Sequence, residues 1–426
     1  MFETRNVGLN GASYERCELA FRARMIIILE PYTKAVQLRT CQRLKVWNLP
    51  RTEKVRLTDW HSEIKRLTKR LDHTNIKILT AMWRFGPRNL LEVSRRTGIP
   101  FTSVYHRVGK LEAEAGRVAH LIPKASSLGL LQLTVHLAAK PGFEDRATRA
   151  LKIPGWWQSI TSSEAPFTHH STHAVPVKCV NEFRKYLRRL MQIGVATQIR
   201  VIPTGDSYPN FPNFSYYDAS AKAWRFDWNR WISALKRRGI GEVVEDPSDY
   251  RTIVDKRDLL IVQEMQNDGR ATFADMAPVL GISLQGVKYH YDKKLAPSGI
   301  VRNFGFDVIP YPNGISARHI VTLAFTNRAA LNRFFSSLRE MFFVEEISKV
   351  LKSNTLIART YVPQTQVRSM FAFFSELARA RILHTYSAVR LTADGETQTV
   401  QPQLFVNQHG WEFNGRRYNA ELSKLR

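Results

Sequence analysis

Three histidines lie close together in the segment THHSTH, at positions His169, His170 and His173. Side chains alternate between the two faces of a β-strand, so His169 and His173 share one face and His170 points to the other. Two histidines on one face can bind a metal ion or a tetrapyrrole. The alternative is that all three are ordinary polar strand residues. This alternative is favoured because a later, similar segment, SNTLIART, has no histidine.

Two further segments, PFTSVYHRVGKL from Pro100 and SLQGVKYHYDKK from Ser283, carry polar and cationic side chains at helical spacing. On an exposed helix such side chains can read the edges of base pairs and neutralise phosphates; otherwise they are ordinary solvated residues. The candidate DNA-binding residues are Thr102, Ser103, Tyr105, His106, Arg107, Lys110, Gln285, Lys288, Tyr289, His290 and Lys293. No catalytic residue, metal ligand or cofactor is assigned.

The charge of the whole chain favours the nucleic-acid interpretation. Its 426 residues include 63 Lys and Arg against 37 Asp and Glu, a formal net charge of +26, which favours polyanionic partners. Cys17, Cys41 and Cys179 are widely spaced and lack a metal-binding pattern, as in a protein of the reducing cytoplasm. No apolar run is long enough to span a bilayer, so no membrane partner is expected.

The chain repeats itself at a constant spacing, which places the two DNA-binding candidates in equivalent elements. LDHTNIKILTAM, from Leu71, aligns with VDKRDLLIVQEM, from Val254. The same spacing pairs Gly86 with Gly269, Gly98 with Gly281, Ile99 with Ile282, Val104 with Val287, Gly116 with Gly299 and Val118 with Val301. Because glycines and apolar positions are retained while the exposed-looking positions differ, the pattern predicts a duplicated fold with a diverged surface.

Each copy predicts three helices. The first follows an N-cap at Asp72 or Asp255, and the third follows a glycine turn at Gly98 or Gly281. Three helices with a glycine turn before the last are the plan of a helix-turn-helix. Val118 and Val301 are each expected to begin a β-wing after the third helix.

The segment after each helix-turn-helix predicts a βαββαβ order, which is the ferredoxin-like arrangement. In the first copy the elements are 130–138, 144–151, 156–162, 169–177, 180–193 and 196–202. In the second copy they are 317–325, 328–339, 342–350, 354–362, 366–378 and 381–390. The expected fold class is therefore α+β, a tandem duplication of a winged helix-turn-helix followed by a βαββαβ ferredoxin-like domain.

These assignments divide the chain into seven parts. They are a basic N-terminal arm that is a candidate for disorder (1-54), winged helix-turn-helix 1 (55-124), ferredoxin-like domain 1 (127-204), an aromatic linker and helix (205-250), winged helix-turn-helix 2 (251-312), ferredoxin-like domain 2 (315-392) and a C-terminal tail (393-426). The linker aromatics stack single-stranded bases or pack a helix onto a domain. They are Tyr216, Tyr217, Trp224, Phe226, Trp228 and Trp231.

The order of elements and three local motifs resemble the Lrp/AsnC (feast/famine) family of transcriptional regulators. The motifs are Leu71-Asp72, Ile78-Leu79 and Gly98-Ile99, with counterparts at Val254-Asp255, Ile261-Val262 and Gly281-Ile282. The resemblance covers most of the chain, and it departs from the family at Pro100, where a hydroxyl is usual and Ser283 keeps it. Family members dimerise through their α/β domains, which implies that the two copies pack together here as a single-chain pseudo-dimer.

The sequence therefore predicts a sequence-specific transcription regulator that binds double-stranded DNA and is not an enzyme. Two options stay open for its partners: a small-molecule effector at the α/β domains and assembly into higher homo-oligomers. Some proteins of Lrp/AsnC type are siroheme decarboxylases, with histidines in the region of His169 to His173. The alternative function is accordingly a siroheme-decarboxylase-like enzyme, or a metal- or tetrapyrrole-binding protein, on the same fold.

Overall fold

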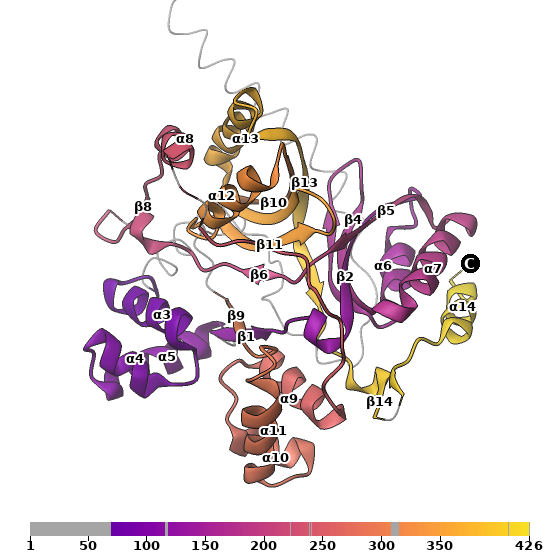
Figure 1. Ribbon diagram of the computed structural model, residues 1–426, viewed down its shortest axis with the longest axis horizontal. Coiled ribbons are helices and arrows are strands. Elements are labelled where there is room, and N and C mark those ends of the chain that lie inside the picture. The colour runs from indigo at the N-terminus through magenta and orange to yellow at the C-terminus, as the bar shows by residue number, and fades with distance from the viewer. Residues whose placement is uncertain are drawn as a thin grey trace, which may run out of the picture. The chain divides into compact units, whose positions relative to one another are not determined.

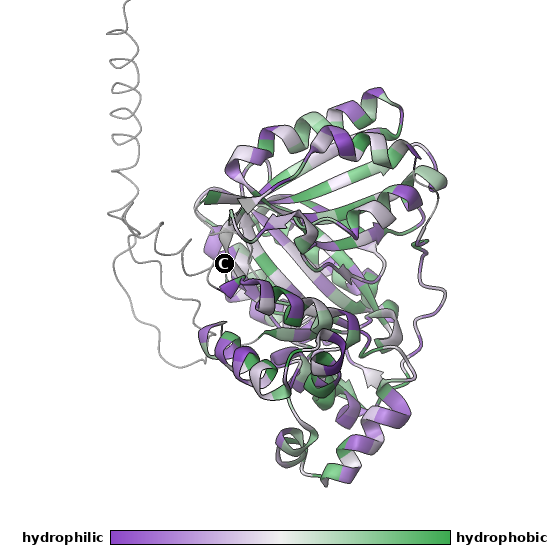
Figure 2. Ribbon diagram, turned by 90° about the vertical axis from the view of Figure 1, so that its left-hand side faces the viewer, coloured by the Kyte–Doolittle hydropathy of each residue, from purple (hydrophilic) through white to green (hydrophobic). Residues whose placement is uncertain are grey.

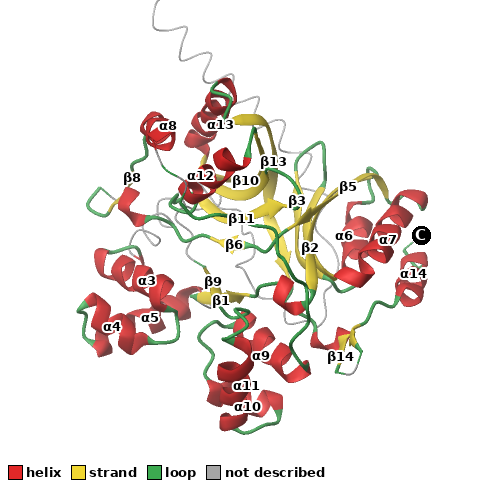
Figure 3. Ribbon diagram, in the orientation of Figure 1, coloured by secondary structure: helices red, strands yellow, loops and turns green. Residues whose placement is uncertain are grey.

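A computed structural model of the chain describes residues 70–425 except 116–117, 222, 238, 240, 308–314 and 408 (Figure 1). The N-terminal arm expected at 1-54 lies outside the described residues. The fold class is α+β, as the sequence predicted, with helices and strands both prominent in Figure 3. Among the described residues, no helix combines the length and the apolar character needed to cross a membrane.

The first helix-turn-helix, called head 1 below, comprises residues 70–115. Its helices are α3 (His73–Phe85), α4 (Leu90–Thr97) and α5 (Phe101–Ala115). Asp72 caps α3 by accepting a hydrogen bond from the backbone N–H of Asn75 at 2.7 Å. Gly98 ends α4 with φ of 68°, a left-handed conformation that glycine adopts without strain. Ile78, Met82, Val104 and Val108 are fully buried and hold the three helices together.

The second helix-turn-helix, called head 2 below, comprises residues 255–299. Its helices are α9 (Lys256–Asn267), α10 (Phe273–Leu280) and α11 (Leu284–His290), and α11 continues as the π-helical turn η5 (Tyr291–Leu295). Side chains cap all three helices, with reciprocal capping boxes at α9 and α10. Met265, Val287 and Leu295 have no exposed surface and form the centre of its core.

The strands that follow the heads do not form a separate wing in each copy, which corrects the sequence expectation. β1 (Ala119–Ile122) follows head 1 and β9 (Asn303–Phe306) follows head 2, and they pair with each other as an antiparallel ribbon. Ala119 lies opposite Phe306 and Ile122 lies opposite Asn303. The backbone N–H and C=O groups of a strand need hydrogen-bond partners, and here the strand of each copy supplies the partners for the strand of the other.

The two heads also touch through side chains. The Arg88 guanidinium of head 1 lies 4.3 Å from the centre of the Phe273 ring and 5.1 Å from that of Tyr291, both in head 2. Glu112 at the far end of α5 forms an ion pair with Arg270 in the loop after α9. A backbone hydrogen bond adds to these contacts, because the N–H of Gly269 donates to the carbonyl of Ala119 in β1 at 2.8 Å. These contacts fix the position of α5 relative to α11.

Both α/β domains have the expected βαββαβ order. The first contains β2 (Leu130–Ala139), α6 (Glu144–Lys152), β3 (Trp157–Ser163), β4 (His169–Pro176), α7 (Val180–Gln192) and β5 (Ala196–Thr204). The second contains β10 (Ser316–Phe325), α12 (Arg328–Leu338), β11 (Val344–Val350), β12 (Thr355–Pro363), α13 (Gln364–Arg379) and β13 (Leu383–Thr397). Each element overlaps the residues that the sequence assigned to it.

The two four-stranded sheets join edge to edge in one antiparallel sheet. With the short strand β6 (Tyr208–Pro209) of the linker, the strand order is β12-β10-β13-β3-β4-β2-β5-β11-β6. β13 pairs with β3 at one junction, and Thr204 of β5 lies opposite Val350 of β11 at the other. An additional pairing of β11 with β12 closes the row of strands into a ring. The domains therefore pack together within one chain, and they do so through strand pairing.

Helices cover the outer face of this ring, and polar residues gather on its inner face. Leu133, Val135 and Leu137 of β2 alternate outward into a core shared with α6 and α7, while Gln132, Thr134 and His136 point inward. In Figure 2 hydrophobic segments mark the strands, and the helices that cover them alternate between hydrophobic and hydrophilic residues. The inner face is the surface on which the two domains meet.

The aromatic linker packs onto the second domain, as one of the two sequence interpretations proposed. Its helix α8 (Trp228–Arg237) places Trp231 in a stack with Phe373 of α13, with ring centres 4.1 Å apart. Trp231 is 5% exposed, and the Trp228 indole N–H donates to Gln366 at 2.8 Å. A buried indole cannot stack on a nucleic-acid base, so Trp231 takes no part in single-strand stacking.

The C-terminal tail ties head 2 to the first domain. Its strands β14 (Phe405–Val406) and β15 (Gly410–Trp411) form a hairpin, and α14 (Gly415–Ser423) packs on α7. The Asn407 side chain accepts from the backbone N–H of Lys256 at the start of α9, at 2.9 Å. Trp411, 3% exposed, donates to the carbonyl of Leu128 in the first domain.

We expect replacement of Gly269 by Ala to destabilise the protein by about 1–3 kcal/mol through overpacking. A Cβ atom there would lie 3.0 Å from the backbone carbonyl carbon and oxygen of Ala119, which the β1–β9 ribbon holds in place. Gly286→Ala is the matched control, because its Cβ would meet side chains at 3.5 Å or more and alanine favours a helix over glycine. Urea denaturation of both variants checks this. Equal stability of Gly269→Ala and the wild type would contradict the fixed contact between the heads.

Candidate nucleic-acid interface

On head 1, five of the predicted DNA-binding residues face solvent along α5. Thr102, Ser103, Tyr105, His106 and Lys110 are exposed, and Tyr105 is 57% exposed. The sixth, Arg107, is half-buried and is engaged within the head, since it donates to Asp72 and Asn75. The outward row of α5 is therefore polar and aromatic, with one free-standing cation at Lys110.

On head 2, the structure divides the predicted residues. Gln285, Lys288, Tyr289 and Lys293 are exposed on α11 and η5. His290 is 9% exposed and faces the core of the head, so its assignment to the DNA-binding surface is wrong. It lies three residues after the buried Val287 on the same side of α11, and its Nδ1 contacts the buried Asp258 carboxylate.

In head 1 an ion pair joins the third helix, α5, to Asp72 at the N-terminus of the first helix, α3. Arg107 Nη1 of α5 lies 2.7 Å from Asp72 Oδ2 and 2.9 Å from the Asn75 side-chain oxygen. Burial works to raise the pKa of Asp72, but the hydrogen bonds from Arg107 and from the Asn75 backbone lower it below its usual value. Asp72 stays ionised, so it keeps α5 in place.

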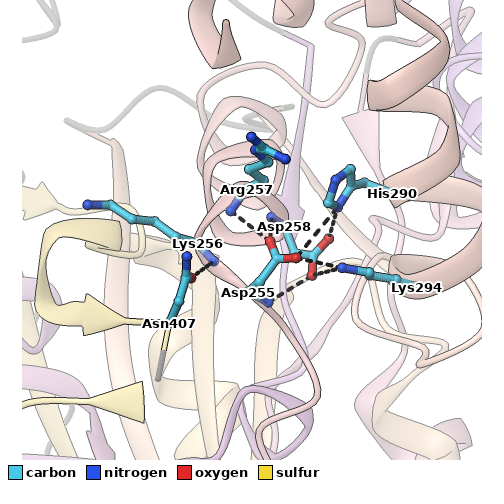
Figure 4. A network of polar contacts seen from close by, with 7 residues as sticks. All are labelled: Asp255, Lys256, Arg257, Asp258, His290, Lys294 and Asn407. Atoms are coloured by element: carbon cyan, nitrogen blue, oxygen red, sulfur yellow. Dashed lines mark hydrogen bonds and ion pairs between the residues drawn. The ribbon is translucent and has the colours of Figure 1, made fainter. Parts of the chain in front are cut away.

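Head 2 carries the same connection with different residues (Figure 4). Asp258 has no exposed side-chain surface, and its Oδ1 lies 2.6 Å from Nδ1 of His290. Lys294 Nζ lies 2.5 Å from Asp255 Oδ2 and 3.4 Å from Asp258 Oδ2. Burial works to raise the pKa of Asp255, but the hydrogen bond from Lys294 and the backbone bond to Asp258 lower it. Asp258 and His290 align with Asn75 and Arg107 of head 1. In both heads this pair joins the third helix to the first, but different side chains form the contact.

The same cluster has the ligand types of a cation site. Ligand atoms of Asp255, Asp258 and His290 lie within 4.8 Å of one another. The Lys294 ammonium already contacts both carboxylates and supplies the positive charge that a metal ion would bring. The cluster is therefore explained by the ion pairs that hold α11 and η5 against α9.

The histidines of THHSTH are buried, and they split between the two faces of β4 as alternation predicts. His169 hydrogen-bonds through both ring nitrogens, to Thr168 at 2.8 Å and Thr148 at 2.9 Å. His173 contacts Phe183 of α7 and hydrogen-bonds to Ser171. Burial lowers the pKa of His173 to about 3, so it stays neutral at pH 7. His169 and His173 therefore act as core residues and not as a metal-binding pair.

His170 points the other way, toward the inside of the strand ring, where sequence analysis had placed no site. It lies opposite His136 of β2, with ring centres 5.0 Å apart, and Nδ1 of each ring lacks a partner among the described residues. A small cavity of about 30 Å³, partly open to solvent, adjoins it; its lining includes Thr134, His170, Thr172, Thr204, Glu346 and Arg359. Burial lowers the pKa of His136 to about 4, helped by the charge of Arg200.

Sequence reasoning also missed apolar residues in the outward rows of the third helices. Phe101 and Leu284 occupy aligned positions at the start of α5 and α11, and they are 45% and 44% exposed. The sequence analysis assigned neither residue to a core or to a surface. The constant spacing of the repeat carried the signal, because it places both residues directly after the turn.

Comparison with known proteins supports the assignment of head 2. Residues 254–293 match the family model of winged helix-turn-helix DNA-binding domains. The chain thus contains a helix-turn-helix segment of DNA-binding type. No protein with a curated description matches the sequence.

Solved structures show similarity at low sequence identity. The siroheme decarboxylase NirDL is 11% identical with a TM-score of 0.49, and the match covers 82% of this chain and 97% of NirDL. A transcriptional regulator from Neisseria meningitidis, in complex with L-Met, is 18% identical with a TM-score of 0.29 and covers 35% of this chain and 96% of its own. AsnC of E. coli is 12% identical with a TM-score of 0.27, over 35% and 98% of the two chains.

The match to NirDL contradicts the sequence-based expectation that the chain is not an enzyme, because an enzyme aligns with 82% of it. At 11% identity this likeness concerns the fold and transfers neither a substrate nor a reaction. The matches to regulators and to a decarboxylase therefore leave function to the residues of the sites themselves.

We expect Asp258 and His290 to be more strongly coupled than Asp72 and Arg107. The side chains of the first pair are 0% and 11% exposed, whereas those of the second are 44% and 38% exposed and are screened by water. Alanine double-mutant cycles on unfolding free energy should give about 1–3 kcal/mol for the first pair and under about 1 kcal/mol for the second. Equal coupling energies for the two pairs would show that burial does not set the strength of these ion pairs.

Proposed function

We propose that this protein is a sequence-specific regulator that binds duplex DNA through α5 and α11 at once. The observation that carries the proposal is the pair of outward rows on the third helices of the two heads, which offer hydrogen-bonding and cationic side chains to solvent. A third helix of this kind fits the major groove, where side chains reach base edges. The helix-turn-helix family match at 254–293 supports the same interpretation.

The two rows differ in chemistry, so we infer that they recognise different half-sites. At aligned positions Thr102 corresponds to Gln285, and Tyr105 corresponds to Lys288. A glutamine side chain can bond an adenine in a bidentate way, and a threonine cannot. A homodimer presents two identical helices and selects a near-palindrome, whereas this chain presents two different ones.

The contacts between the heads support a fixed spacing of the two half-sites. The β1–β9 ribbon, the Glu112–Arg270 ion pair and Arg88 against Phe273 all join head 1 to head 2. A rigid pair of recognition helices suits half-sites about one helical turn apart or a multiple of it.

Selection from random duplexes is the experiment that tests the proposal. It should recover an asymmetric site, and affinity for that site should fall with salt at a log–log slope of about −0.9 per phosphate contact. A perfect palindrome would contradict the two-half-site model. A slope near zero, or no enriched sequence, would contradict duplex recognition itself.

Gln285→Ala should then weaken binding by about 1–3 kcal/mol at one half-site and leave the base preference at the other unchanged. Gln403→Ala is a matched control, because Gln403 is an exposed glutamine of the C-terminal tail. Competition assays with each half-site altered in turn measure the effect. An equal loss at both half-sites would show that Gln285 acts on the fold of head 2 and not on one base pair.

A second candidate function rests on the cavity inside the strand ring. We propose that it holds a small polar molecule, as an effector or as a substrate. His170, 1% exposed, adjoins this cavity with an unpartnered Nδ1, and so does Arg359, whose Nε is unpartnered among the described residues. Burial, with the charges of His136 and Arg359, lowers the pKa of His170 well below 6.5. Its ring is therefore neutral and can either accept a hydrogen bond from a ligand or donate its own N–H to one.

Native mass spectrometry of the full-length chain checks this candidate. We expect a bound small molecule that is retained by the wild type and lost in His170→Asn, since the asparagine cannot reach the same contacts. His384→Asn serves as the control, because His384 is exposed on β13. Retention of the adduct in His170→Asn, or an adduct-free wild type, would contradict the cavity as a ligand site.

A further inference from the structure

The helix α7 and the C-terminal helix α14 carry a concentration of exposed cations at a distance in sequence from both recognition helices. Arg184, Lys185, Arg188 and Arg189 repeat at a spacing that places them on one face of α7, and all four are exposed. Glu182 is the single acidic residue among the thirteen of this helix. The cations therefore repel one another with little compensation from their own helix.

The tail enlarges this surface. Tyr418, 4% exposed, packs α14 against Tyr186 of α7, with ring centres 6.5 Å apart. The neighbouring Arg416 and Arg417 are exposed beside it. We call the six residues the α7–α14 basic face: Arg184, Lys185, Arg188, Arg189, Arg416 and Arg417. Among the described residues a compensating charge comes from Glu421 of α14, whose pKa is lowered by its hydrogen bond from Lys424 and, to a smaller extent, by the charge of Arg417.

The corresponding helix of the second domain has no such face. α13 carries two cations, Arg368 and Arg379, and Arg379 forms an ion pair with Glu376 at 3.1 Å. The two helices occupy the same place in the βαββαβ order and cover the same face of their sheets, so the fold does not require the charge. The difference indicates a partner for the first domain.

The basic face continues from head 2. The core of head 2 merges with those of the first domain and the tail, and Asn407 of the tail caps the start of α9 beside the exposed Lys256 and Arg257. In Figure 1, β14 lies between α9 and α14, and α14 lies beside α7. Exposed cations thus lie at both ends of this path.

We propose that the α7–α14 basic face binds the phosphate backbone of duplex DNA outside the two half-sites. This inference rests on the proposed function, and it adds a second, sequence-independent contact surface to it. Lipid suits the face poorly, because the large apolar residues Phe183 and Leu190 of α7 are 0% exposed, and Met191 alone of its large apolar side chains is exposed, at 39%. A duplex presents regularly spaced phosphates that match a row of arginines.

The test uses the full-length chain and two duplexes. The short duplex holds the selected site alone, and the long one adds about three helical turns on each side. Arg184→Gln combined with Arg188→Gln neutralises part of the face. Arg368→Gln combined with Arg379→Gln is the matched control, because it removes two exposed arginines from the equivalent helix of the second domain.

On the long duplex, the α7 variant should lower the magnitude of the log–log salt slope by about 1.8, or about 0.9 for each lost phosphate contact. Its affinity for the short duplex and its base preference should match the wild type, and the control variant should match it on both duplexes. An unchanged slope on the long duplex, with intact binding to the short one, overturns the basic face alone. If the α7 variant loses binding to phosphatidylserine vesicles while its salt slopes on both duplexes match the wild type, duplex DNA is not the partner of the basic face.

The outcomes separate this inference from the proposed function. A wild type that fails to bind the short duplex overturns both. A wild type that binds the short duplex, but binds the long one with the same salt slope, leaves the proposed function standing and removes the second surface.

Discussion

The closure of two antiparallel sheets into one ring is the constraint on which the rest of this structure depends. Edge strands carry unpaired N–H and C=O groups, and each domain leaves two such edges. Here β13 covers β3, and β11 adjoins β5, so the second domain satisfies the edges of the first. The domains cannot separate without exposing these groups. Everything attached to them, the heads included, is held in one frame.

Within this frame the two halves are attached differently. Head 1 has its own small core, to which Phe211 of the linker contributes. The core of head 2 runs without interruption into the first domain and the tail. The linker helix α8 is absorbed by the second domain through Trp231. A homodimer would treat both heads alike, whereas a single chain can anchor one head more firmly than the other and give each its own surface.

Some polar residues of this protein hold its helices in place, and others are available to bind a partner. The carboxylates of Asp72 and Asp258 fasten each third helix to the first helix of its head, which leaves the opposite sides of α5 and α11 free. The inner face of the ring is different, because His136 and His170 stay neutral there and His170 lines the cavity. Exposed rows on the heads suit a polyanion, and the enclosed histidines suit a small molecule.

The sequence by itself determined the order of elements, both heads and most of the outward residues on α5 and α11, because local periodicity and the repeat fix which side of a helix is apolar. It could not determine the partner of β1, the closure of the ring or the place of the tail, since pairing between distant strands leaves no local pattern. His290 shows the limit within one helix. The buried carboxylate of Asp258, on the first helix of the head, holds the His290 ring inward, and only tertiary packing brings these two residues together.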